Sequence, residues 1–331
     1  MRRLTPILLF FFIPFIAKGQ EVHFSQFYAS PLFLSPSYAG TSDGFRLAAN
    51  YRDQWPGIKD AFTSYSFGLD YNLAALRSGI GLLAWRDTKG ELGYNTTNLG
   101  LIYSYDVYAF KHLHFRPGLQ LNYITSGIDY SKLRLREQLV LGSSASYSRP
   151  DFAPFNYLDM AVSGLAYTQK LWTGFKIDHL LRPGQVLNGQ ERLPLEINVF
   201  GGYEFTLHNK SVKESDEHLM AAFNFMTTAR FMQLEAGALY MNKGVQIGGW
   251  YRGLPFTNNN QRNDAVILSI GYVFNNVNLG YSHDFTISGL STSSNGANEI
   301  SMVLLFDNPL KNSKKRKALK CPTFNFRRAG K

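Results

Sequence analysis

The feature that most restricts the fold is an alternation of large apolar and small polar residues that recurs along the chain. In residues 98–107 one face carries only large apolar side chains and the other is mostly small and polar, with Ile102 the exception. The apolar series is Leu99, Leu101, Tyr103, Tyr105 and Val107, and the polar series is Asn98, Gly100, Ser104 and Asp106. A period of two gives each series its own face of a β-sheet.

The composition of the two faces indicates the surroundings of the sheet. The polar face uses Gly, Asn and Ser where a soluble sheet would show many Lys, Glu and Arg, and only 18% of the chain is charged. Small polar residues suit a crowded or wet lumen, whereas Tyr, Phe and Leu suit lipid and its interfacial aromatic girdles. The pattern therefore predicts an all-β, transmembrane, antiparallel β-barrel of the outer membrane. The alternative is a secreted β-sandwich, which also alternates.

The number of strands and the connection lengths favour the barrel. We expect about fourteen strands, near 44–52, 63–73, 78–87, 94–108, 112–124, 157–168, 171–178, 195–206, 217–229, 231–242, 244–252, 264–274, 277–286 and 298–306. An even number returns both termini to one side, assigned to the periplasm. Connections on that side are tight turns, except 207–216. Those on the other side include the long segments 125–156, 179–194, 253–263 and 287–297, as in outer-membrane barrels.

The N-terminus resembles a secretory signal peptide over residues 1–19. Arg2 and Arg3 precede an apolar run, residues 7–17, and Ala17-Lys18-Gly19 provides a cleavage site. The apolar run is too short for a membrane-spanning helix. Residues 20–43 are aromatic but precede the first strand, so we expect a plug inside the lumen. The barrel then covers 44–306, and a basic periplasmic tail covers 307–331.

The net charge of +10 is not spread over the protein. The tail has nine basic residues against one acidic, and residues 1–19 have three basic ones, which leaves a near-neutral middle. A nucleic-acid partner is therefore not expected, since such binders carry basic residues on a folded face. The tail is either a solvated end or a docking element for an anionic surface or protein partner. Its candidate partner-binding residues are Lys314, Lys315, Arg316, Lys317 and Cys321, the last a free thiol or half of an intermolecular disulfide.

A search for chemistry nominates no catalytic, cofactor-binding or metal residue. His112 and His114 share a strand face and could bind a metal, but an amphipathic role near a membrane interface is favoured. No Gly-x-Ser-x-Gly motif occurs, so we expect no enzyme and no cofactor. A barrel lipid hydrolase would need a Ser–His pair that nothing in the sequence identifies.

A loop just past the first expected strand offers a second group of candidate partner-binding residues. These are Arg52, Asp53, Gln54, Trp55 and Pro56. One interpretation is a girdle tryptophan followed by a turn proline. The other is a motif that faces a partner or packs a loop, and both stay open.

Several segments together resemble the PorP/SprF family. The specific ones are His23-Phe24-Ser25-Gln26-Phe27-Tyr28 with Pro36-Ser37-Tyr38-Ala39-Gly40-Thr41, and Asn50-Tyr51-Arg52-Asp53-Gln54-Trp55-Pro56. Weaker ones are Gly249-Trp250-Tyr251-Arg252, Gly280-Tyr281-Ser282-His283-Asp284, Asn298-Glu299-Ile300 and Cys321-Pro322. His283 departs from the family, which often has Tyr there.

The resemblance implies an outer-membrane component of the type IX secretion system. It would support the secretion or surface anchoring of an adhesin-like cargo, in some members for gliding motility. Expected partners are the exported adhesin or other cargo, periplasmic or outer-membrane secretion components, and outer-membrane lipid. The loops 125–156 and 179–194 would hold the cargo. The alternative is a passive porin or FadL-like solute transporter, which a lumen lined by opposed charges would favour.

Overall fold

The computed structural model describes residues 22–110, 113–129, 154–184, 192–207, 217–229, 231–254, 263–287 and 295–307. The expected signal peptide, the tail beyond Asp307 and most of loop 125–156 lie outside these residues. The strands are β1 (Gly44–Gln54), β2 (Phe62–Leu73), β3 (Ser78–Lys89), β4 (Tyr94–Tyr105), β5 (Val107–Phe110), β6 (Leu113–Gly127), β7 (Phe155–Tyr167), β8 (Leu171–Asp178), β9 (Glu196–Thr206), β10 (Glu217–Thr228), β11 (Met232–Asn242), β12 (Val245–Gly253), β13 (Asn263–Phe274), β14 (Val277–Thr286) and β15 (Ala297–Asp307).

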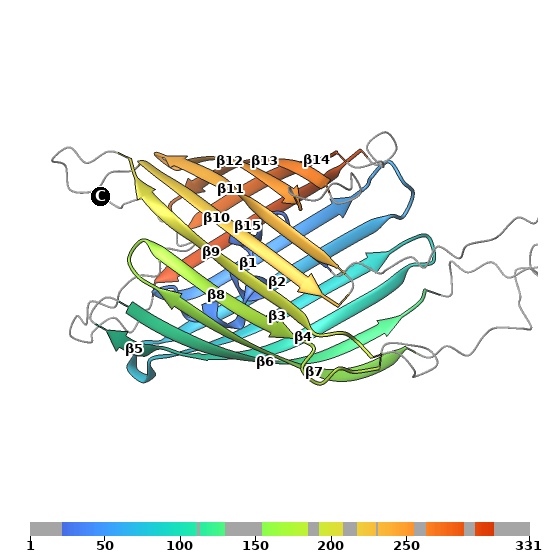
Figure 1. The fold of residues 1–331 in the computed structure, drawn as a ribbon, viewed down its shortest axis with the longest axis horizontal. Coiled ribbons are helices and arrows are strands. Elements are labelled where there is room, and N and C mark those ends of the chain that lie inside the picture. The colour runs from blue at the N-terminus through green and yellow to red at the C-terminus, as the bar shows by residue number, and fades with distance from the viewer. Residues whose placement is uncertain are drawn as a thin grey trace, which may run out of the picture.

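These strands form one closed antiparallel barrel, shown from the side in Figure 1. The first strand pairs with the last in the register Gly44↔Asp307, and β4 pairs with β6 on the far side. The short strand β5 continues β4 beyond Asp106 and pairs with the start of β6. The described residues therefore build a fourteen-stranded wall, which confirms the predicted fold and its strand number.

The two faces of the wall have the residues that the alternation predicts. Leu99, Leu101 and Tyr103 are about half exposed on the outside, whereas Asn98 and Ser104 are buried on the inside. Nearly all of the other strands add exposed Leu, Ile, Tyr or Phe side chains to the outer face, and β11 adds Met232. Such an apolar band allows the wall to face hydrocarbon while every strand edge stays paired.

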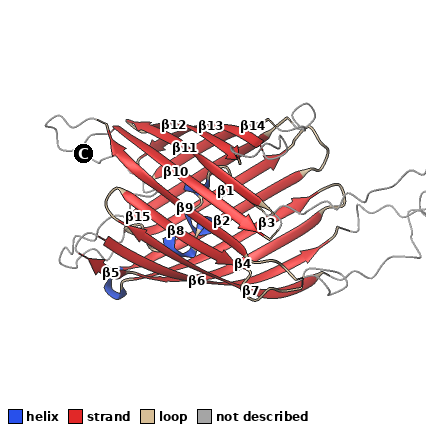
Figure 2. Ribbon diagram, viewed as in Figure 1, coloured by secondary structure: helices blue, strands red, loops and turns tan. Residues whose placement is uncertain are grey.

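Connection lengths differ between the two ends of the barrel, as expected. At the end that we call the short-turn end, β7–β8, β11–β12 and β13–β14 are joined by two or three residues. At the opposite, long-loop end, β6–β7, β8–β9, β12–β13 and β14–β15 are joined by much longer segments. The elements are almost all strands, as Figure 2 shows. None of the described helices is long and apolar enough to span a membrane.

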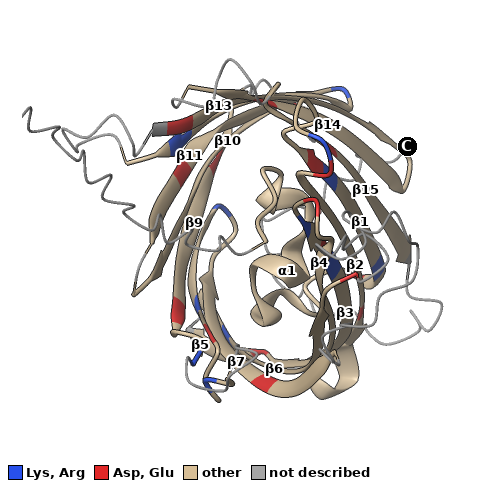
Figure 3. Cartoon of the chain, turned by 90° about the vertical axis from the view of Figure 1, so that its right-hand side faces the viewer, with Lys and Arg blue, Asp and Glu red and all other residues tan. Residues whose placement is uncertain are grey.

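The short helices sit inside the barrel, in the part of the chain before the first strand. These are η1 (Phe27–Ala29), α1 (Pro31–Leu34) and η2 (Pro36–Tyr38), while η3 (Ala74–Leu76) forms a turn between β2 and β3. The view along the barrel in Figure 3 shows α1 enclosed by the strands. We call residues 22–43 the lumen segment.

The lumen segment runs the length of the barrel before β1 begins. Val22 lines the same cavity as Thr96 and Tyr157 of the long-loop half, whereas Gly40 contacts Asp70 at the short-turn end. The strand ends Gly44 and Asp307 do meet at one end, as an even strand number requires. The lumen segment, however, carries the chain back to the opposite end. Which end faces the periplasm stays a prediction.

Candidate functional site

The lumen segment owes its compact form to two prolines and a polar cap. Pro31 begins α1 and Pro36 begins η2, positions at which the fixed φ of proline suits a helical turn and its missing N–H costs nothing. The Ser35 hydroxyl accepts a hydrogen bond from the Ser37 amide. Three successive turns therefore replace an extended strand and present side chains to the wall on all sides.

One apolar cluster joins the lumen segment to the wall. Trp250 of β12 stacks on Tyr28 at a centroid distance of 5.3 Å and meets Phe27 edge-on at 5.2 Å. Across the lumen, the Tyr38 and Phe200 rings lie 5.6 Å apart. Aromatic pairs in these geometries contribute about 0.5–1.5 kcal/mol beyond the area they bury. The alternation alone predicted a polar inner face. The structure shows that this face also carries large apolar side chains where the lumen segment packs.

A smaller cluster accounts for Ile102, the residue that broke the alternation. Its side chain is buried on the inner face with Leu83 of β3, and both pack against Leu32 and Ala39 of the lumen segment. An apolar residue on the wet face would be costly in an empty lumen. Here it has an apolar partner, so the exception in the pattern marks where the segment docks.

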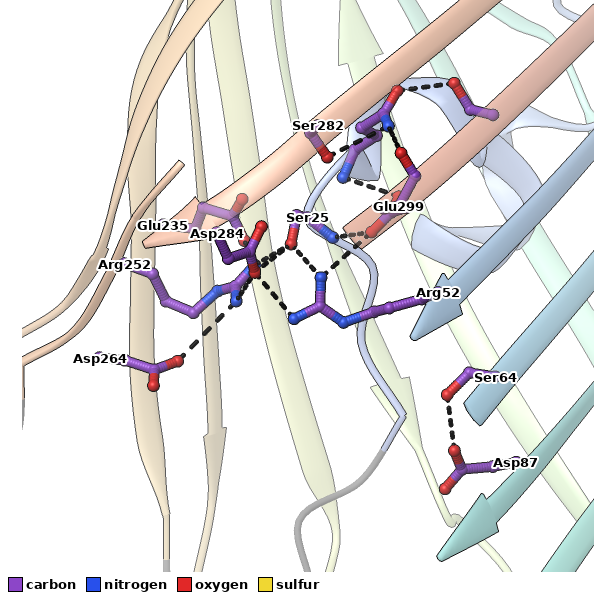
Figure 4. A network of polar contacts seen from close by, with 12 residues as sticks. Ser25, Arg52, Ser64, Asp87, Glu235, Arg252, Asp264, Ser282, Asp284 and Glu299 are labelled. Atoms are coloured by element: carbon purple, nitrogen blue, oxygen red, sulfur yellow. Dashed lines mark hydrogen bonds and ion pairs between the residues drawn. The ribbon is translucent and has the colours of Figure 1, made fainter. Parts of the chain in front are cut away.

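The long-loop half of the lumen holds a buried ionic network centred on Ser25 (Figure 4). The Ser25 hydroxyl donates to Asp284 Oδ2 at 2.7 Å and accepts from the guanidinium groups of Arg52 and Arg252, the latter at 2.5 Å. Both arginines also bind Asp284 Oδ2 at 2.8 Å. One serine hydroxyl of the lumen segment therefore closes a ring between β1, β12 and β14.

Glu299 of β15 holds the backbone of the same part of the lumen segment. Its two carboxylate oxygens accept the amides of Ser25 at 2.7 Å and of Gln26 at 3.0 Å. The Gln26 side chain in turn donates to Ser282 at 3.2 Å and accepts from Ser301 at 2.6 Å. We call these contacts, with the ring around Ser25, the outer seat.

Charge in the outer seat is close to balanced, which makes its burial tolerable. Arg52 and Arg252 face the carboxylates of Asp284, Glu299 and Glu235, and all five side chains are almost fully buried. Arg252 also reaches the half-exposed Asp264, 3.8 Å away. Removing one member of such a buried network typically costs about 3–5 kcal/mol, because an uncompensated charge is left behind.

A second anchor, the inner seat, lies near the short-turn end. Arg46 of β1 forms a two-pronged ion pair with Asp70 of β2, with N–O distances of 2.8 and 3.1 Å. The same Arg46 donates to the Tyr38 carbonyl, and Asp70 accepts the Gly40 amide at 2.7 Å. Arg116 of β6 and Ser104 of β4 both donate to the carbonyl of Ala39. The wall thus satisfies the backbone of the segment on both sides.

Glycines on the inner face let the segment backbone touch the wall. A Cβ added at Gly79 would lie 2.1 Å from the Ala39 carbonyl oxygen, and one at Gly118 would lie 2.5 Å from the Ser37 nitrogen. Both distances are impossible contacts. Small inner-face residues at these positions are therefore required by the docked segment, and a merely wet lumen would not require them.

The structure places the candidate residues of the first loop in two environments. Arg52 points into the lumen and belongs to the outer seat, so its described contacts are internal. Asp53, Gln54 and Trp55 are half-buried and Pro56 is exposed at the rim. Trp55 has φ of 62°, donates its amide to the Gly296 carbonyl at 2.8 Å, and packs edge-on against Phe62. Their partner-binding role stays a prediction.

The second candidate group, Lys314, Lys315, Arg316, Lys317 and Cys321, lies outside the described residues. His112 is also outside them, while His114 pairs with Asp106 at 2.9 Å and stacks on Tyr167. Within the described ranges, no three His, Cys, Asp or Glu side chains are grouped so that they could hold a metal ion.

Sequence reasoning missed the charged residues that complete the outer seat. Glu235, Arg252, Asp284 and Glu299 all occupy inner-face positions, and on β12 and β14 the other inner residues are mainly Gly, Ser, Asn or Gln. A charged side chain at such a position was the available signal. The site also brings together motifs that are distant in sequence. These motifs contain Ser25, Arg52, Arg252, Asp284 and Glu299.

Opposed charges therefore line the lumen, as a porin would require, but those in the two seats bind each other and the lumen segment. Lys176 follows the same rule, since its ammonium group binds Asp178 at 2.9 Å and the Phe33 carbonyl at 3.1 Å. The arrangement can hold a polypeptide in place. At the two seats, the charged side chains are occupied by these contacts and do not form a row of free charges along a path for water.

Comparisons with known proteins identify related sequences and folds. A family model described as "Type IX secretion system membrane protein PorP/SprF" matches residues 16–304. No curated protein sequence matches the chain. Among solved structures, the CymD monoaromatic hydrocarbon channel is 12% identical, with a TM-score of 0.49, covering 85% of this chain and 93% of that one. The Ralstonia pickettii toluene transporter TbuX is 10% identical, with a TM-score of 0.49, covering 84% and 94%. Omp33 of Acinetobacter baumannii is 6% identical, with a TM-score of 0.44, covering 81% and 100%.

Proposed function

We propose that this chain supports the secretion or surface anchoring of an adhesin-like cargo. The chain belongs to the PorP/SprF family of type IX secretion system membrane proteins. The protein is an outer-membrane component of that secretion system. The identity of the cargo as an adhesin, and a link to gliding motility, are the finer parts of the proposal.

The observation that carries the proposal is the lumen segment held at both ends. The outer seat binds Ser25 and Gln26, and the inner seat binds the backbone from Tyr38 to Gly40. Buried ionic contacts of this kind oppose the rapid opening that a passive pore needs. A lumen that an anchored segment occupies along its length suits a scaffold that holds partners at the membrane better than it suits a channel.

The partner contacts follow from the two ends of the barrel. In the proposal, loops 125–156 and 179–194 hold the exported cargo at the long-loop end. The tail 307–331 reaches a periplasmic partner, because its basic residues would attract an acidic surface. Trp55 and Pro56 lie at the rim with the loops and would contribute to the cargo contact.

A gene deletion tests the function. We expect the deletion strain to lose one or more large surface proteins from the cell surface, measured by surface biotinylation and mass spectrometry of cells and medium. Complementation with the full chain restores them. Unchanged secretion and unchanged retention of every cargo in the deletion strain would disprove the proposal.

Truncation tests the tail separately. A chain ending at residue 310 keeps all described strands, and its folding is checked by heat-modifiable mobility in gel electrophoresis. We expect co-purification of periplasmic secretion components to fall, and the loss to be mimicked by high salt acting on the full chain. Unaltered co-purification would remove the docking role.

A FadL-like transporter is the second candidate, and one observation favours it. The long-loop half of the lumen contains a cavity partly lined by apolar side chains, including Phe24, Phe33, Leu83 and Trp85. Uptake of a radiolabelled hydrophobic solute into vesicles distinguishes the two functions. Saturable uptake that requires this protein would favour the transporter, and no uptake above protein-free vesicles would favour the scaffold.

A further inference from the structure

The lumen segment does not fill the barrel. Beside it, in the long-loop half, lies a cavity of about 1140 Å³, open solvent included. Its walls are the inner faces of strands from β3 to β11, and its remaining wall is the lumen segment itself through Phe24, Phe27 and Phe33.

The polar part of this wall combines side-chain amides with charged side chains, among them Lys176, Asp178 and Glu196. Six amides come from five strands: Asn98 on β4, Gln120 and Asn122 on β6, Asn198 on β9, Asn224 on β10 and Gln233 on β11. We call this set the amide rail. An amide side chain carries one acceptor and two donors, the same groups that a peptide bond presents.

Much of the amide rail lacks hydrogen-bond partners among the described residues. Both amide atoms of Asn98 are unpartnered, as are the side-chain oxygens of Gln120, Asn198 and Asn224. Asn98, Gln120 and Asn198 are more than nine-tenths buried. Buried polar groups are nearly always paired in folded proteins, so an unpaired group calls for an explanation. Several on one cavity wall indicate a surface built to pair with something else.

The same lumen already shows what its inner face binds. Side chains of the wall bind the backbone of the lumen segment at Ser25, Gln26, Phe33, Tyr38, Ala39 and Gly40. The wall side chains in these contacts are charged, and they belong to Glu299, Lys176, Arg46, Arg116 and Asp70. An amide of the wall makes the same kind of contact, because Asn72 donates to the Ser42 carbonyl at 2.9 Å. The amide rail provides this amide chemistry on the side that the segment leaves open.

We propose that the amide rail binds an extended polypeptide segment, through its backbone, that enters the cavity from the long-loop end. This deepens the proposed function and rests on it in one respect, namely that the segment belongs to exported cargo. The apolar side chains of the segment would face Phe24, Phe33 and Trp85, while its peptide groups pair with the amides. Recognition of the backbone makes the site tolerant of sequence.

A binding selection tests the proposal on the full-length purified barrel in lipid nanodiscs. A phage-displayed library of random twelve-residue peptides is the probe, and selected peptides are then synthesised and measured by fluorescence anisotropy. We expect Asn98→Ala/Asn198→Ala to weaken binding at least tenfold. Thr97→Ala/Ile197→Val changes the adjacent outward-facing positions of the same strands and is expected to leave binding unchanged.

N-methylated peptides test whether the backbone is recognised. Methylation of the amides that pair with the rail is expected to weaken binding to the wild type at least tenfold, with much less effect on the double variant. The folded state of both variants is checked by heat-modifiable mobility, which the loss of unpartnered amides is expected to preserve.

Three outcomes would overturn the proposal. The first is a selection that yields no binding peptide. The second is a set of peptides that bind the double variant as tightly as the wild type. The third is an affinity that does not change when the peptide backbone amides are methylated. Maltoheptaose and myristate are measured in parallel. Binding of either that is lost in the double variant, without peptide binding, would assign the cavity to a saccharide or a lipid.

This test and the deletion test fail independently. Peptide binding in nanodiscs with normal secretion in the deletion strain would remove the secretion role and keep the site. Conversely, if the deletion strain loses surface cargo and Asn98→Ala/Asn198→Ala restores it fully, the secretion role stands. The amide rail would then have no part in it.

Discussion

The backbone amide of Ser25 donates to the Glu299 carboxylate at 2.7 Å, although 274 positions separate the two residues. This contact joins the segment before the first strand to the last strand of the barrel. Around it, Arg52, Arg252 and Asp284 are held by the same serine. The stability of the outer seat should therefore respond to changes on strands that are distant in sequence.

Glu299→Gln is expected to destabilise the folded barrel. The glutamine is isosteric, but its NH2 group is a donor where a carboxylate oxygen of Glu299 accepts the Ser25 or Gln26 amide, and the ion pair with Arg52 is lost, so we expect a cost of about 3–5 kcal/mol. Urea unfolding in lipid vesicles, followed by tryptophan fluorescence, measures the change. The control is Ile300→Val on the outer face one residue away. A midpoint for Glu299→Gln equal to that of the control would contradict the role of the network.

Gly79→Ala is expected to displace the lumen segment from the inner seat. The added methyl would meet the Ala39 carbonyl oxygen at 2.1 Å, so backbone must shift, at a cost on the order of 1–3 kcal/mol. Gly249→Ala is the matched control, because a Cβ there meets nothing within 4 Å. Limited proteolysis of the folded barrel, read by mass spectrometry, should cut residues 22–43 faster in Gly79→Ala only. Equal rates in both variants would show that the close approach is unimportant.

The lumen segment is expected to keep the barrel closed to ions. In planar bilayers the full chain should be nearly silent, and a variant lacking residues 23–40 should form stable open channels, since this removes the groups bound by both seats. Ser37→Cys/Ser163→Cys, made with Cys321→Ser, provides the opposite control. The two hydroxyl oxygens lie 2.5 Å apart, so an oxidised pair should hold the segment in place. Equal conductance of all three proteins would rule out a closing role.

Residues of the first loop are expected to separate into structural and partner-binding groups. Arg52→Gln should lower the urea midpoint, because Arg52 holds Asp284 and Glu299 in the lumen. Trp55→Ala/Pro56→Ala lies at the rim and should leave the midpoint within about 1 kcal/mol while reducing cargo co-purification. The two measurements are made on the same preparations. Normal cargo recovery with the rim variant would assign Trp55 and Pro56 to loop packing alone.

The wall of the barrel could be predicted from sequence because its pattern is local. Alternation decides which side of a strand each residue faces, and the small inner residues beside Tyr and Leu identified the lumen correctly. Ile102 was visible as an exception, but its explanation required Leu32, seventy positions earlier. A period of two carries no information on what lies across the lumen.

The two seats could not be predicted, for a related reason. Alternation places Glu235, Arg252 and Asp284 on the inner face, but it does not give their height along the barrel or their neighbours across it. Arg52 lies in a loop motif for which the sequence leaves open a girdle, loop-packing or partner-facing role, and its described contacts are all internal. A search for charges on otherwise small, polar strand faces would have found Arg252 and Asp284, but not Glu299, because Val303 and Leu305 share its face of β15.

The position of Glu299 on β15 has a consequence for how the molecule is made. Residues 22–43 emerge from synthesis first, yet the carboxylate that receives Ser25 and Gln26 comes with the final strand. The outer seat is complete only when β15 pairs with β1 and the cylinder shuts. Chains truncated before β15 therefore lack both the seam and the outer anchor, and they keep only the inner seat, whose residues lie on β1, β2, β4 and β6.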